Sequence, residues 1–342
     1  MTTIEQPFQT ETVSLRALQW VKRLALSQET VLLIITVLAM AILSTQNDRF
    51  LTRRNLEKEA VLLFEVGLMA LPMTYIIITG GIDLSVGSIF GMSAIILGFM
   101  WQDHGWPIES AIVAAMVVGT LGGLLNGLFI VRLGVPPLIT TLATLAFYRG
   151  VALGISEARS ARGFPTEFFQ VGRGRFDLTI PYVAKLNYPN QIWVLAIAVI
   201  ITGVILSRTS FGRSLYAIGN NELATRFAGI RVNRNKLLIY TFSGFMCGVA
   251  SVFFVSRVTT TRSDMGTGME LDVIAAVVLG GTSIFGGSGS VVGTLLGVIL
   301  IAALKNGLLL AHYKGDAAQV MVGIILIAAI LINNTIQRYL KR

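Results

Sequence analysis

Long runs without a charged residue constrain this chain of 342 residues more than any other feature of its sequence. A membrane-spanning helix needs about 20 consecutive, mainly apolar residues, and it satisfies its backbone hydrogen bonds internally. Only 13% of the residues are charged, about half the share of an ordinary soluble domain. The sequence therefore predicts an all-α polytopic membrane protein and excludes disordered, disulfide-rich secreted and soluble enzyme classes. The uncharged runs cover residues 30–47, 66–82, 84–102, 110–131, 133–148, 186–207, 237–256, 273–304 and 317–337.

The run at 273–304 is too long for one membrane span and too short for two. It contains GGTSIFGGSGS at 280–290, where glycines and hydroxyl side chains interrupt a helix. We expect a short segment near 272–284 and a full span near 291–311. The total is then about ten transmembrane helices, with short or broken segments near 80–85 and 280–290. We divide the chain into a cytoplasmic N-terminal segment at 1–28, a single transmembrane domain at 29–336 and a cytoplasmic tail at 337–342.

The distribution of positive charge indicates which side of the membrane each loop occupies. The loop 208–236 carries six Lys and Arg residues against one acidic residue, Glu222, which favours the cytoplasm. Over the whole chain the Lys and Arg counts nearly balance, with 13 inside and 12 outside. We expect both termini in the cytoplasm, the segments 157–185 and 257–272 outside, and an interfacial helix at 48–59. The net charge of +9 then reflects topology and lipid contact, and predicts no nucleic acid partner.

A helix break with an acidic residue lies at 78–91, in ITGGIDLSVGSIFG. Gly80 and Gly81 interrupt the apolar run, and Asp83 follows them. An acid at membrane depth usually faces the protein interior or a water-filled path. Alternatively, Asp83 lies in a tight turn and caps a helix that begins at Leu84, as Asp side chains commonly do. The sequence leaves both interpretations open.

A second break, VLGGTSIFGGSGSVVG, lies 200 residues later at 278–293. It shares with the first break a glycine pair, Gly280 and Gly281, and a helix that starts with small residues. Paired glycine-interrupted segments in two halves of a membrane protein indicate a transport site. The alternative is that these glycines only allow close packing of helices, as small residues do in GMSAIILG and GTLLGVIL.

The loop 208–236 contains a short predicted helix, ELATRFAGI. Asn220 or Asn221 is its expected N-cap, and Gly229 its expected end. Such a helix exposes Ala224, Phe227 and Ala228, either to a partner protein or to lipid headgroups.

Four long stretches, in order, resemble the permease subunits of the ribose-type ABC importers, which carry monosaccharides and related small polyols into bacteria. They are GGIDLSVGS at 80–88, FGRSLYAIGNNELATRFAGIRV at 211–232, MGTGMELDVIAAVVLGGTSIFGG at 265–287 and GSVVGTLLGVILIAALKNGL at 289–308. The resemblance extends over about 50–335. One departure is that Gly219 precedes Asn220 and Asn221, where the family usually has two glycines before Asn.

The resemblance implies a coupling helix at 220–229 that docks into a separate cytoplasmic ATPase. The coupling residues would be Asn220, Asn221, Glu222, Ala224, Phe227, Ala228 and Gly229. It also implies that this chain lies in the bacterial inner membrane, pairs with a second permease subunit and receives substrate from a periplasmic sugar-binding protein. The sequence has no GxxxxGK[ST] motif for ATP phosphates, so ATP and magnesium would bind the ATPase, and no cofactor is expected on this chain.

Between the two permease subunits we expect a translocation path formed by the glycine breaks and by MGTGMELD at 265–272. Gly266 and Gly268 permit a tight turn there. Glu270 and Asp272 could hydrogen-bond sugar hydroxyls or cap a short helix, and capping is favoured for Asp272. The predicted path residues are Gly80, Gly81, Asp83, Ser85, Gly266, Gly268, Glu270, Asp272, Gly280 and Gly281.

Catalytic chemistry has no obvious constellation in this sequence. His104 and His312 lie in different expected loops without metal-ligand spacing, and the single Cys247 lies within an apolar run. An intramembrane enzyme is therefore disfavoured. A self-contained secondary transporter remains an alternative, with Asp83 as its ion-coupling carboxylate. Two stretches expected outside, at 160–169 and 256–272, look most like those of rhamnose importers, with autoinducer-2 importers next.

Overall fold

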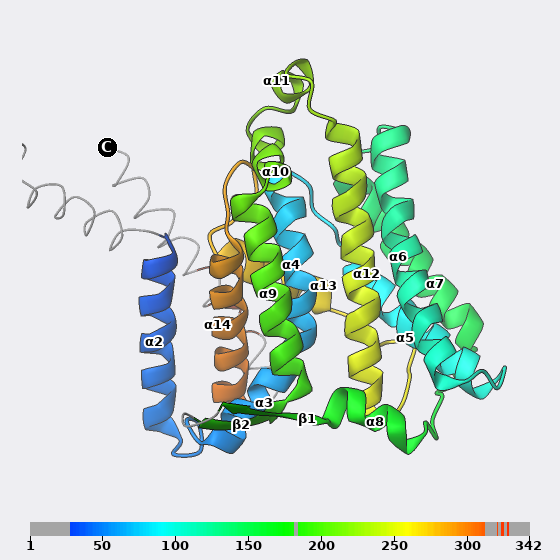
Figure 1. Cartoon of the computed structure of the whole chain (residues 1–342), viewed down its shortest axis with the longest axis vertical. Helices are drawn as coiled ribbons and strands as arrows, with labels where there is room; N and C mark the ends of the chain where they lie inside the picture. The colour runs from blue at the N-terminus through cyan, green and yellow to red at the C-terminus, as the bar shows by residue number, and fades with distance from the viewer. Residues whose placement is uncertain (1–27, 181–183, 312–319, 321–322, 325–326, 328–342) are drawn as a thin grey trace, which may run out of the picture.

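The computed structural model describes residues 28–180 and 184–311, together with 320, 323–324 and 327, and its long helices form a bundle (Figure 1). The helices are α2 (Gln28–Gln46), α3 (Arg53–Leu62), α4 (Phe64–Ile78), α5 (Val86–Gln102), α6 (Ile108–Arg132), α7 (Pro137–Ser156), α8 (Thr166–Arg173), α9 (Asn190–Arg208), α10 (Ser210–Asn220), α11 (Glu222–Phe227), α12 (Val232–Val258), α13 (Met269–Leu279) and α14 (Val291–Leu310). The strands are β1 (Arg175–Ile180) and β2 (Ala184–Pro189).

The all-α polytopic prediction is confirmed. Within the described residues, α2, α6, α7, α9, α12 and α14 are each long and apolar enough to cross a membrane. A seventh span results if α3 and α4, bent by 48° at their junction, are counted as one. Helix α5 has 17 residues and α13 only 11, so α13 is the short segment expected before the second break. The expected last span at 317–337 lies almost wholly outside the described residues, as do the N-terminal segment, the tail and His312.

The two ends of the bundle carry different elements. Helices α10 and α11 stand at one end, whereas α3, α8 and the strands lie at the other (Figure 1). Hydrogen bonds connect the segments at this second end: Arg53 donates to the Asn187 carbonyl, just beyond the expected outer segment 157–185, and the Thr261 N–H donates to the Ala161 carbonyl. The loops therefore group as the charge distribution predicted. Which end faces the cytoplasm stays a prediction.

The outer segment contains the part of the fold that the sequence did not predict. Strands β1 and β2 pair antiparallel, with Arg175 opposite Pro189. The interfacial helix expected at 48–59 begins later, at Arg53, because the Thr52 side chain accepts a hydrogen bond from the Asn55 N–H and acts as its N-cap.

Helices α4 and α5 are the centre of the bundle, since nearly all their residues except the last turn of α5 are buried. Around them, small residues let helices approach closely, as the packing interpretation of the glycines predicted. On α6, a Cβ added at Gly123 would overlap the Tyr240 carbonyl oxygen of α12. On α14, Gly297 lies equally close to the Ala276 carbonyl of α13. The backbones themselves are therefore in contact at both crossings.

We predict that Gly123→Ala destabilises the protein, because the added methyl group must push α6 away from α12. Overpacking of this kind costs about 1–3 kcal/mol. The matched control is Gly150→Ala on α7, where an added Cβ would meet no atom within 4 Å. Thermal unfolding of the detergent-solubilised protein should show a lower Tm for Gly123→Ala and an unchanged or higher Tm for Gly150→Ala. Equal melting temperatures would contradict the close α6–α12 contact.

Candidate coupling and translocation sites

Helix α11 is a short, exposed helix at the end of the bundle (Figure 1). Of the two predicted caps, Asn221 is the N-cap: its side chain accepts a hydrogen bond from the Ala224 N–H at 2.9 Å. Asn220 instead ends α10 and donates to the Tyr216 carbonyl. Gly229 follows α11 with a positive φ of 79°, which stops the helix as predicted. The predicted helix and both its ends are therefore present.

The free face of α11 is apolar. The Phe227 side chain is 84% exposed and Leu223 is 64% exposed, while Ala224 and Ala228 are also exposed. Such a protruding apolar face is uncommon on a surface without a partner.

Glu222 joins α11 to α12. Its carboxylate pairs with Arg226 at 2.7 Å and with Lys236 of α12 at 2.6 Å. Partial burial alone would raise the pKa of Glu222, but the hydrogen bonds and positive charges of Lys236 and Arg226 outweigh it and lower the pKa. The carboxylate is therefore ionised at neutral pH, and its pair with Lys236 restricts how α11 can turn on the bundle, whereas the pair with Arg226 lies within α11.

The two glycine breaks meet directly beneath α10. The Gly287 N–H of the second break donates to the Ile78 carbonyl at the end of α4, at 2.9 Å. A Cβ at Gly219 of α10 would overlap that same carbonyl oxygen, so the three segments are in backbone contact. Tyr216 adds a hydrogen bond to the Gly289 carbonyl at 2.8 Å. Sequence reasoning paired the breaks but did not place them against α10.

The remaining break glycines have the backbone that the sequence suggested. Gly80 and Gly281 adopt positive φ angles of 78° and 89°. Gly81 lies against the Tyr240 hydroxyl, and Gly280 forms the C-cap of α13.

Asp83 is fully buried, and it does not cap a helix at Leu84. Helix α5 begins at Val86, so the capping alternative is wrong, and Asp83 instead faces the protein interior. The carboxylate accepts hydrogen bonds from the Ser85 N–H at 2.9 Å and the Ser85 hydroxyl at 2.6 Å. It thus holds the turn that leads into α5, because only a turn brings the N–H two residues ahead within reach of the side chain.

Ser85 connects Asp83 to a buried polar network that sequence reasoning missed. The Asn126 amide of α6 donates to the Ser85 hydroxyl at 2.7 Å, and Tyr148 of α7 donates to the Asn126 side-chain oxygen at 3.1 Å. Ser243 of α12 lies at 3.4 Å from the other oxygen of Asp83. The signal for this network was Asn126 itself, a lone amide within the uncharged run 110–131. Four helices therefore meet around one turn.

The segment 265–272 turns as its glycines predicted, with positive φ angles of 79° at Gly266 and 83° at Gly268. Glu270 accepts a hydrogen bond from the Gly268 N–H at 3.2 Å, so it is Glu270 that satisfies the start of α13. Asp272 does not cap, which corrects the sequence prediction. It pairs with Lys305 of α14 at 2.6 Å, because α13 and α14 pack side by side.

The other ionisable groups at membrane depth each have a separate partner. Glu65 of α4 pairs with Arg257 of α12 at 2.8 Å. Arg149 of α7 donates to the Ser263 and Met265 carbonyls at 2.8 and 2.7 Å, and so holds the segment before α13. In the described part of the chain these groups form no continuous relay with Asp83.

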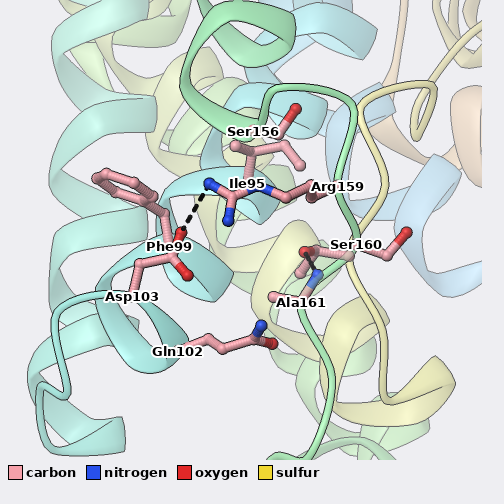
Figure 2. Close-up of a pocket in the computed structure, with 9 residues that line it drawn as sticks. Ile95, Phe99, Gln102, Asp103, Ser156, Arg159, Ser160 and Ala161 are labelled. Atoms are coloured by element: carbon pink, nitrogen blue, oxygen red, sulfur yellow. Dashed lines mark hydrogen bonds and ion pairs between the residues drawn. The ribbon is translucent and has the colours of Figure 1, made fainter.

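A small polar cavity of about 30 Å³ lies beside the turn after α7. Figure 2 shows the Arg159 guanidinium directed toward Asp103, with Gln102, Ser156 and Ser160 around it. This volume holds about one water molecule, so it is too small for a sugar. Among the described residues, no cluster of His, Cys, Asp and Glu could hold a metal ion.

Comparison with known proteins agrees with the resemblance seen in the four sequence stretches. A family described as "Branched-chain amino acid transport system / permease component" matches residues 55–330. The ribose import permease protein RbsC of Bacillus subtilis is 39% identical over 269 residues, which are 78% of this chain and 80% of the relative. RbsC of Escherichia coli K12 is 33% identical over 310 residues, or 88% and 92% of the two chains.

The autoinducer 2 import system permease protein LsrD of Photorhabdus luminescens is 36% identical over 269 residues, covering 78% of this chain and 79% of that protein. These relatives are all named as permeases, which are transport subunits rather than enzymes. With its bundle of apolar helices, this chain is a multi-pass membrane permease and belongs to the family of branched-chain amino acid transport system permease components.

Proposed function

We propose that this chain is the permease subunit of an ATP-driven importer for a monosaccharide, coupled through α11 to a separate ATPase that holds ATP and magnesium. The observation that carries the proposal is α11 itself. It is capped at both ends, fixed by the Glu222 ion pairs, and presents a protruding Phe227 that is 84% exposed. Exposed aromatic anchors on a rigid element are typical of docking sites.

A route from α11 to the membrane follows from the backbone contacts. Helix α10 leads into α11 and lies against the Ile78 carbonyl and the Gly287 N–H. A displacement of α11 by the ATPase would therefore move α10 against the end of α4, which leads to the first glycine break, and against Gly287 of the second break. These contacts support coupling between docking and the path.

We further propose that segment 266–272 lines a path between two permease subunits, which receive substrate from a periplasmic binding protein. The first turn of α13 starts within the bundle rather than at its surface end, since Gly266 packs on Gly87 at the start of α5. Interrupted helices that begin at membrane depth are typical of transport sites.

The substrate class is proposed from the named relatives, which import ribose and autoinducer 2. We favour rhamnose, because SRVTTTRSDMGTGMELD at 256–272 and SARGFPTEFF at 160–169 look most like rhamnose importers. Autoinducer-2 is the next candidate. Two measurements on a strain in which the gene for this chain is deleted would decide among them: growth on rhamnose or ribose, and import of autoinducer-2.

The alternative function, an ion-coupled secondary transporter, draws on the complete burial of Asp83 without a basic partner among the described residues. It is weakened by the separate pairing of Glu65, Arg149 and Lys305, because proton relays need a chain of connected groups.

We predict that Ala224→Arg abolishes ATPase binding while the chain still inserts into the membrane. Docking would bury an unpaired charge, which costs about 3–5 kcal/mol at an interface. The matched control, Ala224→Ser, adds no charge and should retain the partner. Co-purification of the ATPase in detergent measures the difference. Undiminished co-purification and transport by Ala224→Arg would refute the docking assignment.

A second prediction concerns the path. In a Cys247→Ala background, Thr267→Cys and Leu271→Cys should react with a small hydrophilic thiol reagent, because both side chains are exposed. Val273→Cys, at a fully buried position, is the unreactive control. Trapping nucleotide on the ATPase should change the reaction rates at 267 and 271. Rates that stay constant in both states would argue that this segment does not move with the transport cycle.

The third prediction separates the two functions. Asp83→Asn keeps an oxygen that can accept from Ser85 but cannot titrate near neutral pH, so ATP-driven uptake should continue. Asp83→Leu removes the acceptor and leaves buried donors unpaired, at about 1–3 kcal/mol each, so it should lower expression or transport. The measurement is uptake into proteoliposomes that contain the ATPase and binding protein. Loss of wild-type uptake when the proton gradient is collapsed would favour the secondary transporter.

A further inference from the structure

An amphipathic cavity of about 300 Å³ lies between α3, α4, α13 and α14, separate from α11, and Asp272 at the end of the segment 265–272 forms part of its lining. Eight of its twelve lining residues are aliphatic, and none is aromatic. The polar lining residues are Glu59, Asp272, Lys305 and Asn306. Its size is within the usual range for small-molecule sites, about 300–1,000 Å³.

The polar lining contains unsatisfied groups. Asn306 is 7% exposed, and its Nδ2 has no hydrogen-bond partner in the described structure. Glu59 forms no salt bridge or side-chain hydrogen bond there, whereas Asp272 and Lys305 pair with each other at 2.6 Å. A buried amide without a partner is costly, so a ligand that accepts from Asn306 would be stabilised.

The polar and apolar groups of the cavity are ordered as they are in a membrane lipid. Lys305 and Asn306 lie near the last turn of α14, at the bundle end that carries α3 (Figure 1). Val298 lies two helical turns further into the bundle, about 10 Å away along α14. The polar groups are therefore near the membrane surface, and the aliphatic groups lead toward its centre.

We propose that this cavity binds phosphatidylethanolamine, a zwitterionic phospholipid with a primary amine. The headgroup ammonium donates to the Glu59 carboxylate, and a phosphate or ester oxygen accepts from Asn306 Nδ2. An acyl chain then packs on the aliphatic wall. The cavity lining holds two carboxyl groups, Glu59 and Asp272, against one ammonium, that of Lys305, and this balance disfavours an anionic lipid. A lipid with a quaternary amine could not donate hydrogen bonds to Glu59. The lack of aromatic side chains disfavours a sugar, because sugar sites commonly stack the ring on aromatics.

Native mass spectrometry of the full chain in detergent, with added phosphatidylethanolamine, phosphatidylcholine or phosphatidylglycerol, tests the proposal. We expect one tightly retained phosphatidylethanolamine per chain. Ala302→Phe, which fills the cavity, should lose it, while Ile200→Phe on the exposed face of α9 should keep it. Glu59→Gln conserves shape and should lower the preference for phosphatidylethanolamine over phosphatidylglycerol about tenfold, as expected for loss of one charge-assisted hydrogen bond.

Three results would overturn the proposal. The first is that Ala302→Phe and Ile200→Phe retain phosphatidylethanolamine equally, or that the wild type retains phosphatidylglycerol as well as phosphatidylethanolamine. The second is displacement of the lipid by a monosaccharide, which would make the cavity a substrate site. The third is a change in subunit assembly in Ala302→Phe with lipid retention unaltered, which would make it a face between copies. Because Glu59→Gln leaves the aliphatic packing intact, it keeps the test valid should Ala302→Phe fail to fold.

Discussion

The hydrogen bond from the Gly287 N–H to the Ile78 carbonyl joins the two helix breaks, and α10 lies against the same carbonyl. This contact is between backbones, so its geometry does not vary with side-chain rotamers. It requires glycine at 219 and 287, because a Cβ at Gly219 would overlap the carbonyl and Gly287 has a positive φ of 78°. The exposed helix α11 and the membrane segments are thereby connected through a rigid junction, which a side-chain contact would not provide.

Most charged side chains within the bundle contact a partner on another helix or on a neighbouring segment. Glu65 and Arg257 join α4 to α12, Asp272 and Lys305 join α13 to α14, and Arg149 binds carbonyls before α13. Each pair connects elements distant in sequence, so the charges position helices in addition to any transport role. Asp83 differs, since its partners are the N–H and hydroxyl groups of Ser85 in its own turn and the hydroxyl of Ser243 on α12. That arrangement satisfies a carboxylate without a cation and agrees with a structural role in the proposed ATP-driven importer.

The fold positions its two working ends differently. At one end, α11 is held by a side-chain cap and by the Glu222–Lys236 ion pair to α12, and leaves an apolar face uncovered. At the other, α3, α8 and the strands cover the helix ends through backbone and side-chain hydrogen bonds. The first end presents a small protruding element, on which we propose that the ATPase docks, and the second offers a broader surface. The half-length helix α13 lies between them, beside both the proposed path and the amphipathic cavity.

The sequence alone determined the membrane class, the long apolar helices, the glycine breaks and the short exposed helix with its glycine stop, because uncharged length and cap residues are local properties. It also indicated the permease family, through motifs that are contiguous in the chain. Only the tertiary structure decided the partners of Asp83 and Asp272. Capping had been favoured for Asp272 and was one of two interpretations of Asp83, yet Ser85 turns onto Asp83, and Lys305 reaches Asp272 from 33 residues away. Asn126 and Tyr148 belong to the polar network around Asp83 for the same reason. A buried polar group takes whichever partner the packing of helices brings within hydrogen-bond distance. That packing depends on where glycines such as Gly123 let two backbones touch.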